Sequence, residues 1–100
     1  MMVTVFRARP RPEALAELEE SGRRMYEIAS AMPGFVSYKD YVSADGEGVS
    51  IVEFDTAEHL AAWREHPEHR KVQARAREAL LAEYRVQVCR LEREARFPAK

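Results

Sequence analysis

Proline and glycine interrupt this 100-residue chain at four places and separate segments that read alternately as strand and helix. The interruptions fall at residues 9–12, 32–34, 44–48 and at Pro67. Proline cannot continue a helix, and it is well suited to the first position of a new one. The two glycines at 44–48 permit the positive φ angles of a hairpin turn. The chain is therefore predicted to form short elements joined by tight connections.

Four of the segments are rich in β-branched and apolar residues, as strands are. We predict strands over residues 2–8, 35–43, 49–54 and 84–91. Two other segments show the three- and four-residue spacing of a helix face. The first starts at Pro12, and its face is formed by Leu15, Leu18, Gly22, Met25, Ala29 and Met32. The second starts after Asp55, which with Glu58 has the form of a capping box, and it is broken at Pro67. Beyond the break, the inner face is predicted at Val72, Ala76, Ala79, Leu80 and Glu83.

The resulting order is β-α-β-β-α-β. With right-handed crossovers, this order predicts an α+β, ferredoxin-like sandwich in which helices cover one face of a four-stranded antiparallel sheet. A composition of 46% hydrophobic and 33% charged residues fits one globular domain. We place that domain at residues 2–92 and assign residues 93–100 to a charged tail.

The predicted strands are apolar on both faces, although a sheet covered on one side should alternate. In the first strand, Val3 and Val5 share one face while Met2 and Phe6 share the other. One layer of helices buries one face only, so we predict a homodimer in which two sheets pack together as a barrel-like core. A monomer with scattered exposed apolar residues is the alternative.

Charge and cysteine content exclude several classes of protein. The net charge is −1 and no basic stripe is present, so neither nucleic acid nor a membrane surface is an expected partner. Residues 1–7 have neither a charged region nor a long apolar run, so no signal peptide or membrane span is predicted. Cys89 is alone, which excludes an intramolecular disulfide and favours a reducing, cytoplasmic location.

The segment at residues 60–69, Leu-Ala-Ala-Trp-Arg-Glu-His-Pro-Glu-His, holds the only tryptophan and two of the three histidines. Imidazole titrates near neutral pH, so His66 or His69 could act as a general base. Trp63 could instead be core packing, His66 a helix cap and His69 a solvated residue. A metal site is a further possibility, since the local ligand types are His59, Glu65, His66, Glu68 and His69. The helix break disturbs that face and no distant ligand completes a known spacing, so we predict no metal.

The chain contains three motifs that are informative in combination: Met-Pro-Gly-Phe-Val-Ser-Tyr at 32–38, Val-Glu-Phe-Asp at 52–55, and Leu-x-x-Trp-x-x-His-Pro-x-His at 60–69. With the order of elements, they resemble the antibiotic biosynthesis monooxygenase family of the dimeric α+β barrel superfamily. The resemblance covers about residues 2–92. It implies a dimeric barrel with a pocket between the helices and the sheet of each subunit.

The resemblance also implies an activity. Some members of the family oxygenate small phenolic, quinone-forming compounds with molecular oxygen and with no metal or flavin. Such chemistry needs a proton acceptor, a polar anchor and apolar walls in a dry pocket. We assign His66 and His69 as candidate bases and predict no cofactor. The candidate substrate-binding residues are Trp63 and Phe54 as aromatic walls, Tyr38 or Tyr84 as hydrogen-bonding partners of a phenolic oxygen, and Arg7 as an oxyanion partner.

Two other functions remain open at this point. The first is a non-catalytic dimeric module that binds a small apolar ligand or has a structural role. The second is haem degradation, which in the resembling family uses an asparagine, a tryptophan and a histidine. Trp63 matches the tryptophan, but the histidine position falls near Gln73 and the chain contains no asparagine.

Overall fold

The computed structural model describes residues 1–98 and contains a sheet with the strand order β2-β3-β1-β4. The strands are β1 (Met2–Pro10), β2 (Phe35–Val42), β3 (Gly48–Phe54) and β4 (Leu81–Arg90). Neighbouring strands are antiparallel, as predicted. Residues 99–100 of the predicted tail lie outside the described part of the chain.

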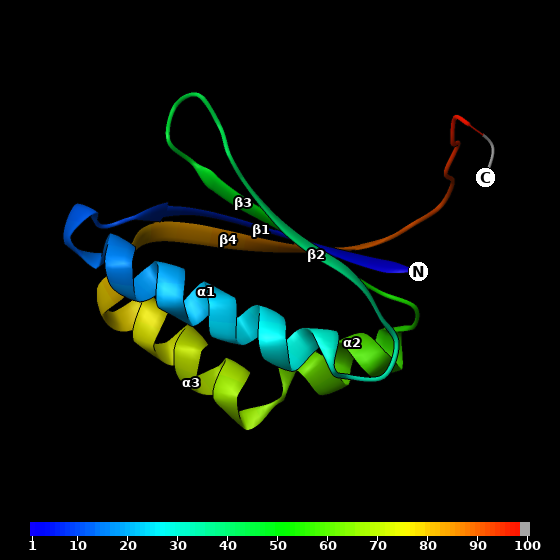
Figure 1. The fold of residues 1–100 in the computed structure, drawn as a ribbon, viewed down its shortest axis with the longest axis horizontal. Coiled ribbons are helices and arrows are strands. Elements are labelled where there is room, and N and C mark those ends of the chain that lie inside the picture. The colour runs from blue at the N-terminus through cyan, green and yellow to red at the C-terminus, as the bar shows by residue number, and fades with distance from the viewer. Residues whose placement is uncertain (99–100) are drawn as a thin grey trace.

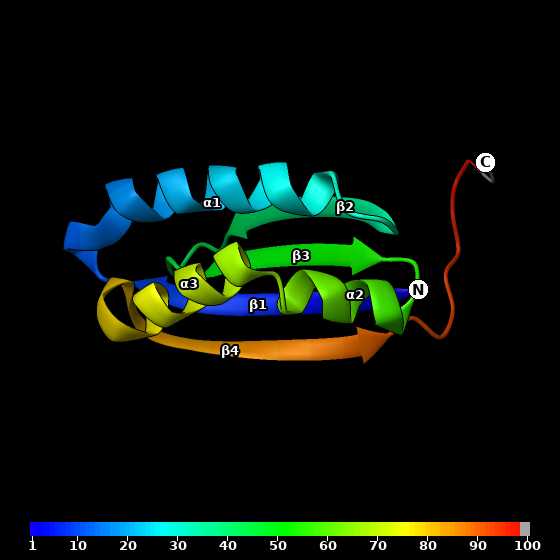
Figure 2. The ribbon, with the colours of Figure 1, turned by 90° about the horizontal axis from the view of Figure 1, so that it is seen from below.

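The helices lie on one face of this sheet (Figure 1). They are α1 (Leu15–Ser30), α2 (Ala57–Arg64) and α3 (Pro67–Arg75). A 3-10 turn, η1 (Pro12–Ala14), precedes α1, and a π-helical turn, η2 (Ala76–Leu80), follows α3. Figure 2 shows α1 on the β2 side of the sheet and the α2–α3 pair along β1. The ferredoxin-like α+β fold and the helix break at Pro67 are therefore confirmed.

The end of the second helical region differs from the prediction. Strand β4 begins at Leu81, three residues earlier than expected, because η2 ends the helix in one wide turn. Leu80 and Leu81 are both buried, one from the helix and one from the strand. Glu83 was wrongly placed on the inner helix face. It is an exposed residue of β4, and its carboxylate lies 3.4 Å from Nε of Arg9.

The start of α2 also differs in detail. The N-cap is Thr56 and not Asp55, because Thr56 has the extended backbone of a cap and its Oγ1 accepts a hydrogen bond from the His59 N–H at 3.1 Å. Asp55 instead contacts the His59 side chain, with Oδ1 2.7 Å from Nδ1.

The core consists of two clusters on the helix-covered face. The larger one lies beneath α2 and the second half of α1 and is formed by Met2, Met25, Ile28, Ala29, Val52, Phe54, Leu60 and Trp63. The smaller one lies at the η1 and η2 end and is formed by Ala8, Ala14, Ala76, Leu80 and Leu81. Burial of these side chains fixes the helices over β1 and β3.

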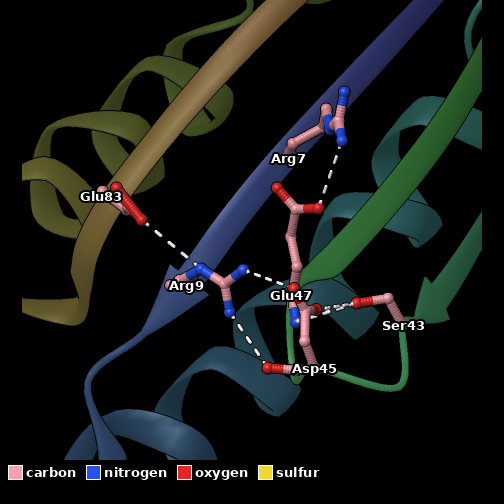
Figure 3. Close-up of polar contacts among 6 residues, drawn as sticks. All are labelled: Arg7, Arg9, Ser43, Asp45, Glu47 and Glu83. Carbon is pink, nitrogen blue, oxygen red and sulfur yellow. Dashed lines mark hydrogen bonds and ion pairs between the residues drawn. The ribbon is translucent and has the colours of Figure 1, made fainter.

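The face of the sheet away from the helices, here called the open face, carries the other set of alternating side chains. Its central apolar residues are Val3, Val5, Val49 and Ile51, which are partly buried in the single chain. At one end of this face, ion pairs tie the β2–β3 turn to β1 (Figure 3). Arg9 donates to the Asp45 carboxylate at 2.9 Å and to its carbonyl at 3.1 Å.

Strand β4 lies largely beyond the helices in Figure 2. Its residues Tyr84, Val86 and Val88 pair with the helix-facing positions of β1, yet they remain 40%, 44% and 49% exposed. Among residues 1–98, no helix is long and apolar enough to span a bilayer.

Candidate functional site

The junction of α2 and α3 brings Trp63 and His69 into direct contact. Pro67 begins α3, which lets the chain turn so that the first turn of α3 meets the last turn of α2. The His69 imidazole stacks on the Trp63 indole, with ring centroids 4.0 Å apart and planes inclined by 14°. The same imidazole lies 3.0 Å, through Nδ1, from the Trp63 carbonyl oxygen. Two contacts from one residue thus fix both the position and the orientation of the His69 ring.

The hydrogen bond to Trp63 also determines which nitrogen of His69 holds the proton. A carbonyl oxygen can only accept, so Nδ1 must be the donor. In the neutral ring Nε2 therefore keeps its lone pair. Burial lowers the pKa of His69 from its usual 6.5, aided by the nearby His66 and opposed by the Trp63 carbonyl. His69 is consequently neutral near pH 7, with Nε2 able to accept a proton.

His66 has the opposite arrangement. It is the N-cap of α3, and its Nδ1 accepts a hydrogen bond from the Glu68 N–H at 3.1 Å. Its lone pair is thus engaged in capping, and Nε2 carries the proton in the neutral ring. Of the two candidate bases, the geometry favours His69, and it gives His66 the structural role that the sequence offered as an alternative.

Trp63 and Phe54 lie in the larger core cluster. Their exposed fractions are 3% and 0%, so neither side chain presents an open face to solvent. Phe54 packs edge-on against Phe35, with centroids 5.9 Å apart. The two residues that the sequence predicted as an aromatic wall are therefore part of interior packing in this structure. The His69 ring covers Trp63 and separates it from solvent.

The two candidate tyrosines lie at opposite edges of the sheet. Tyr38 faces the helices from β2, where its ring meets Tyr26 edge-on at 5.9 Å. Burial, with a smaller effect of Asp40, raises the pKa of Tyr38 to about 12, so its hydroxyl stays protonated. Tyr84 lies on β4, and its hydroxyl accepts a hydrogen bond from Arg77 Nε at 3.1 Å. Three strand spacings of about 4.8 Å separate β2 from β4, and the register places Tyr38 level with Val88, about 13 Å along the strand from Tyr84, so one small phenol cannot contact both hydroxyls.

Arg7 does not join this site. Successive side chains of a strand point to opposite faces, and Ala8 is buried beneath the helices, so Arg7 lies on the open face. There its guanidinium donates to the Glu47 carboxylate at 3.3 Å (Figure 3). An inward oxyanion partner was the predicted role of Arg7, and the parity of β1 prevents it in the single chain.

Sequence reasoning missed a contact between Asp55, His59 and the loop before β2. The hydrogen bond from His59 lowers the pKa of the Asp55 carboxyl. Gly34, with φ +82°, packs so closely on this pair that a Cβ would lie 2.3 Å from both Asp55 Oδ1 and His59 Nδ1. The Pro33-Gly34 dipeptide and the four-residue spacing of Asp55 and His59 were the available signals. Among residues 1–98, no three His, Cys, Asp or Glu side chains are grouped closely enough to hold a metal ion.

A groove of about 440 Å³ lies between α1 and β2. It was not predicted, and the sequence signal was a glycine within a helix face. Six residues line the groove, and none of the predicted site residues is among them; they are Leu18, Glu19, Gly22, Arg23, Tyr26 and Asp40.

Comparison with known proteins identifies the family. The model of the antibiotic biosynthesis monooxygenase family matches residues 1–75. This chain belongs to that family. It is 30% identical over 78 residues to the uncharacterized protein YqjZ of Bacillus subtilis (strain 168), covering 78% of this chain and 68% of that protein.

Solved structures of family-like proteins have the same fold. Rv0793 from Mycobacterium tuberculosis is 30% identical, with a TM-score of 0.85 over 95% of this chain and 98% of its own. SnoaB from Streptomyces nogalater, described as a cofactor-independent oxygenase, is 20% identical, with a TM-score of 0.79 over 93% and 94% of the two chains. At that identity the second likeness shows the fold alone.

Proposed function

We propose that this family member is a cofactor-independent monooxygenase that oxidises a small aromatic, quinol-like compound with molecular oxygen, and that His69 is its base. The observation that carries the proposal is the fixed tautomer of His69, with Nδ1 held by the Trp63 carbonyl and Nε2 left to accept a proton. Membership of the antibiotic biosynthesis monooxygenase family and the oxygenase description of SnoaB support the reaction class.

In the proposed reaction the substrate itself supplies the electrons. His69 Nε2 takes the phenolic proton, and the resulting anion passes one electron to O2, giving a substrate radical and superoxide. These combine at ring carbon to form a peroxide. His69 returns its proton to the outer peroxide oxygen. Loss of the ring hydrogen as a proton and cleavage of the O–O bond then yield a quinone and hydroxide, and the hydroxide combines with the ring proton to give water. A phenol plus O2 thus gives a quinone plus H2O.

The candidate binding residues have different roles in this proposal. Trp63 orients His69 from the core side, while either Tyr38 or Tyr84, but not both, donates to the substrate oxygen. The hydroxyl of Tyr38, whose pKa burial raises to about 12, stays protonated throughout the neutral range and can donate to the substrate oxygen. Arg7, on the open face, has no part in the chemistry of the same subunit.

Oxygen uptake in a flavin-free, chelator-treated solution tests the proposal with a panel of phenols and naphthols. His69→Ala should lower the uptake rate by at least ~100-fold, the usual contribution of a positioned base. His66→Ala is the matched control, because it removes a cap and leaves the His69 base in place. Equal rates for the wild-type protein and His69→Ala would refute the assignment of the base.

A homodimer through the open face accompanies this proposal. The support is the uncovered apolar group of Val3, Val5, Val49 and Ile51, opposite the helix layer. Sedimentation should give a dimer for the wild-type protein and a monomer for Ile51→Lys, because a buried unpaired ammonium costs several kcal/mol. Ala62→Lys, on the exposed side of α2, should remain a dimer. A wild-type monomer would contradict the assembly. We also place the protein in the cytoplasm, where the free thiol of Cys89 stays reduced.

A second candidate function is a dimeric module that binds a small apolar ligand without turnover. The observation in its favour is that Trp63 and Phe54 are closed within the core, while the groove beside α1 contains neither histidine. Binding of an aromatic compound with no oxygen uptake across the panel would support this function over the oxygenase.

A further inference from the structure

The groove between α1 and β2, about 440 Å³ in volume, is large enough for a compound with one aromatic ring. Leu18 and Tyr26 stand at its two ends on the same helix face. They are eight residues apart, which is about 12 Å along an α-helix at about 1.5 Å per residue. Gly22 lies midway between them. A Cβ placed on Gly22 would meet no atom within 4 Å, so the space above the helix backbone is open.

The β2 side of the groove is acidic. Asp40 lies on the helix-facing side of β2 opposite Ser50, and its Oδ1 accepts a hydrogen bond from the Ser50 hydroxyl at 2.5 Å. The remaining carboxylate lone pairs can accept from a ligand. Glu19 and Arg23 complete the charges of the groove. Two carboxylates, Asp40 and Glu19, and one guanidinium, Arg23, give the groove a net charge of −1. Among residues 1–98, none of the three is in an ion pair, so no other charged side chain neutralises them.

Tyr26 supplies a polarised aromatic surface. Its ring is held edge-on by Phe35 at 6.1 Å and by Tyr38 at 5.9 Å, yet the residue is 48% exposed. The face of a tyrosine ring attracts a cation within about 6 Å of its centre. A ring orientation fixed by two aromatic neighbours reduces the entropy that would be lost on binding.

We propose that this groove binds a small aromatic compound bearing a protonated amine, with the ring over Gly22 between Leu18 and Tyr26 and the ammonium group at Asp40. A cation is favoured over a neutral donor because it gains both the net negative charge of the groove and the Tyr26 ring face. The site is separate from the Trp63–His69 contact and does not depend on the proposed oxygenase reaction. It lies on the helix side of the sheet, so packing of two open faces leaves it accessible.

Titration of the full chain with 2-phenylethylamine, followed by amide NMR shifts, tests the proposal. We expect saturable shifts centred on residues 18–26 and Asp40, with a Kd of about 1 mM. The neutral analogue 2-phenylethanol should bind at least ~5-fold more weakly, as loss of one exposed charge contact predicts. Shifts centred on residues 63–69, or equal affinities for amine and alcohol, would overturn the proposal.

Two variants distinguish binding in the groove from nonspecific binding of the amine elsewhere on the protein. Gly22→Leu fills the seat and also favours the helix, so it should fold at least as well as the wild-type protein while losing the amine shifts. Asp40→Asn keeps an oxygen for the Ser50 hydroxyl and removes the charge. It should weaken the amine ~5-fold and leave the alcohol unchanged. His69→Ala should bind the amine normally, which distinguishes failure of this site from failure of the proposed oxygenase. Undiminished amine binding by Gly22→Leu would refute the groove as the site.

Discussion

Replacement of Gly34 by alanine should destabilise the fold in two separable ways. An L-residue held at φ +82° costs roughly 1–2 kcal/mol. The new Cβ would also lie 2.3 Å from Asp55 Oδ1 and from His59 Nδ1, so their hydrogen bond must be displaced. The side chains of Asp55 and His59 are 52% and 40% exposed, so loss of this contact adds at most about 1 kcal/mol. The total expected loss for Gly34→Ala is about 1–3 kcal/mol.

Gly46→Ala is a matched control for the backbone contribution. Gly46 has φ +91°, close to that of Gly34, but a Cβ there meets no atom within 4 Å. Its replacement should therefore cost only the roughly 1–2 kcal/mol of the left-handed conformation. The difference between the two variants isolates the contact with the Asp55–His59 pair.

Urea unfolding followed by circular dichroism measures both losses, and thermal unfolding should separate the variants by about 4–8 °C for each kcal/mol. An independent readout is the Asp55 carboxyl, whose pKa the His59 hydrogen bond lowers in the wild-type fold. In Gly34→Ala this pKa should rise toward its ordinary value, whereas in Gly46→Ala it should not change. Equal stability losses together with an unchanged Asp55 pKa would refute the reasoning.

Three further outcomes are expected. The pKa of His69 is lowered in the folded protein, so below pH 6.5 the unfolded chain binds more protons at this residue than the folded chain does. The free energy of unfolding should therefore fall as the pH drops toward the folded pKa, and His69→Gln should reduce this pH dependence in urea unfolding. Tyr38 should ionise near its pKa of about 12 in an ultraviolet titration, and Tyr38→Phe should remove that late transition. Thr56→Ala should cost about 1 kcal/mol of unfolding free energy through loss of the cap on His59 N–H, and Thr56→Ser should cost little.

The helix break and the order of strands were predictable because their signals are local and covalent. Pro67 lacks a backbone N–H and has a fixed φ, so the break at this residue follows from the residue type alone. The hairpin glycines are likewise a local signal, because their residue type permits the positive φ of a turn. The early start of β4 was not predictable, because Leu80 and Leu81 fit equally well on a helix or at the start of a strand. The turn at η2 decides between these structures, and it depends on tertiary packing.

The position of Arg7 shows a different limit of sequence reasoning. Alternation alone predicts that Arg7 shares a face with Val3 and Val5, but not which face the helices cover. Both sets of β1 side chains are mostly apolar, with Met2, Phe6 and Ala8 on one face and Val3 and Val5 on the other, so hydrophobicity does not separate them. The decision comes from partners distant in sequence: Val52 and Phe54 of β3 are buried under the helices, and the register places them beside Thr4 and Met2. Arg7 then lies on the open face, away from His69.

The two histidines of the α2–α3 junction differ in role because Pro67 stands between them. His66 precedes the new helix and has the extended backbone of a cap, φ −58° and ψ 132°, so its ring is turned toward the free N–H groups of α3. Because the Glu68 N–H donates to Nδ1 of His66, Nδ1 carries no proton of its own. His69 lies inside the first turn of α3, where its ring reaches back to a carbonyl at the end of α2, and an acceptor at Nδ1 requires a proton there. Opposite helix termini thus select opposite tautomers, and only the residue facing the carbonyl end keeps Nε2 as a base.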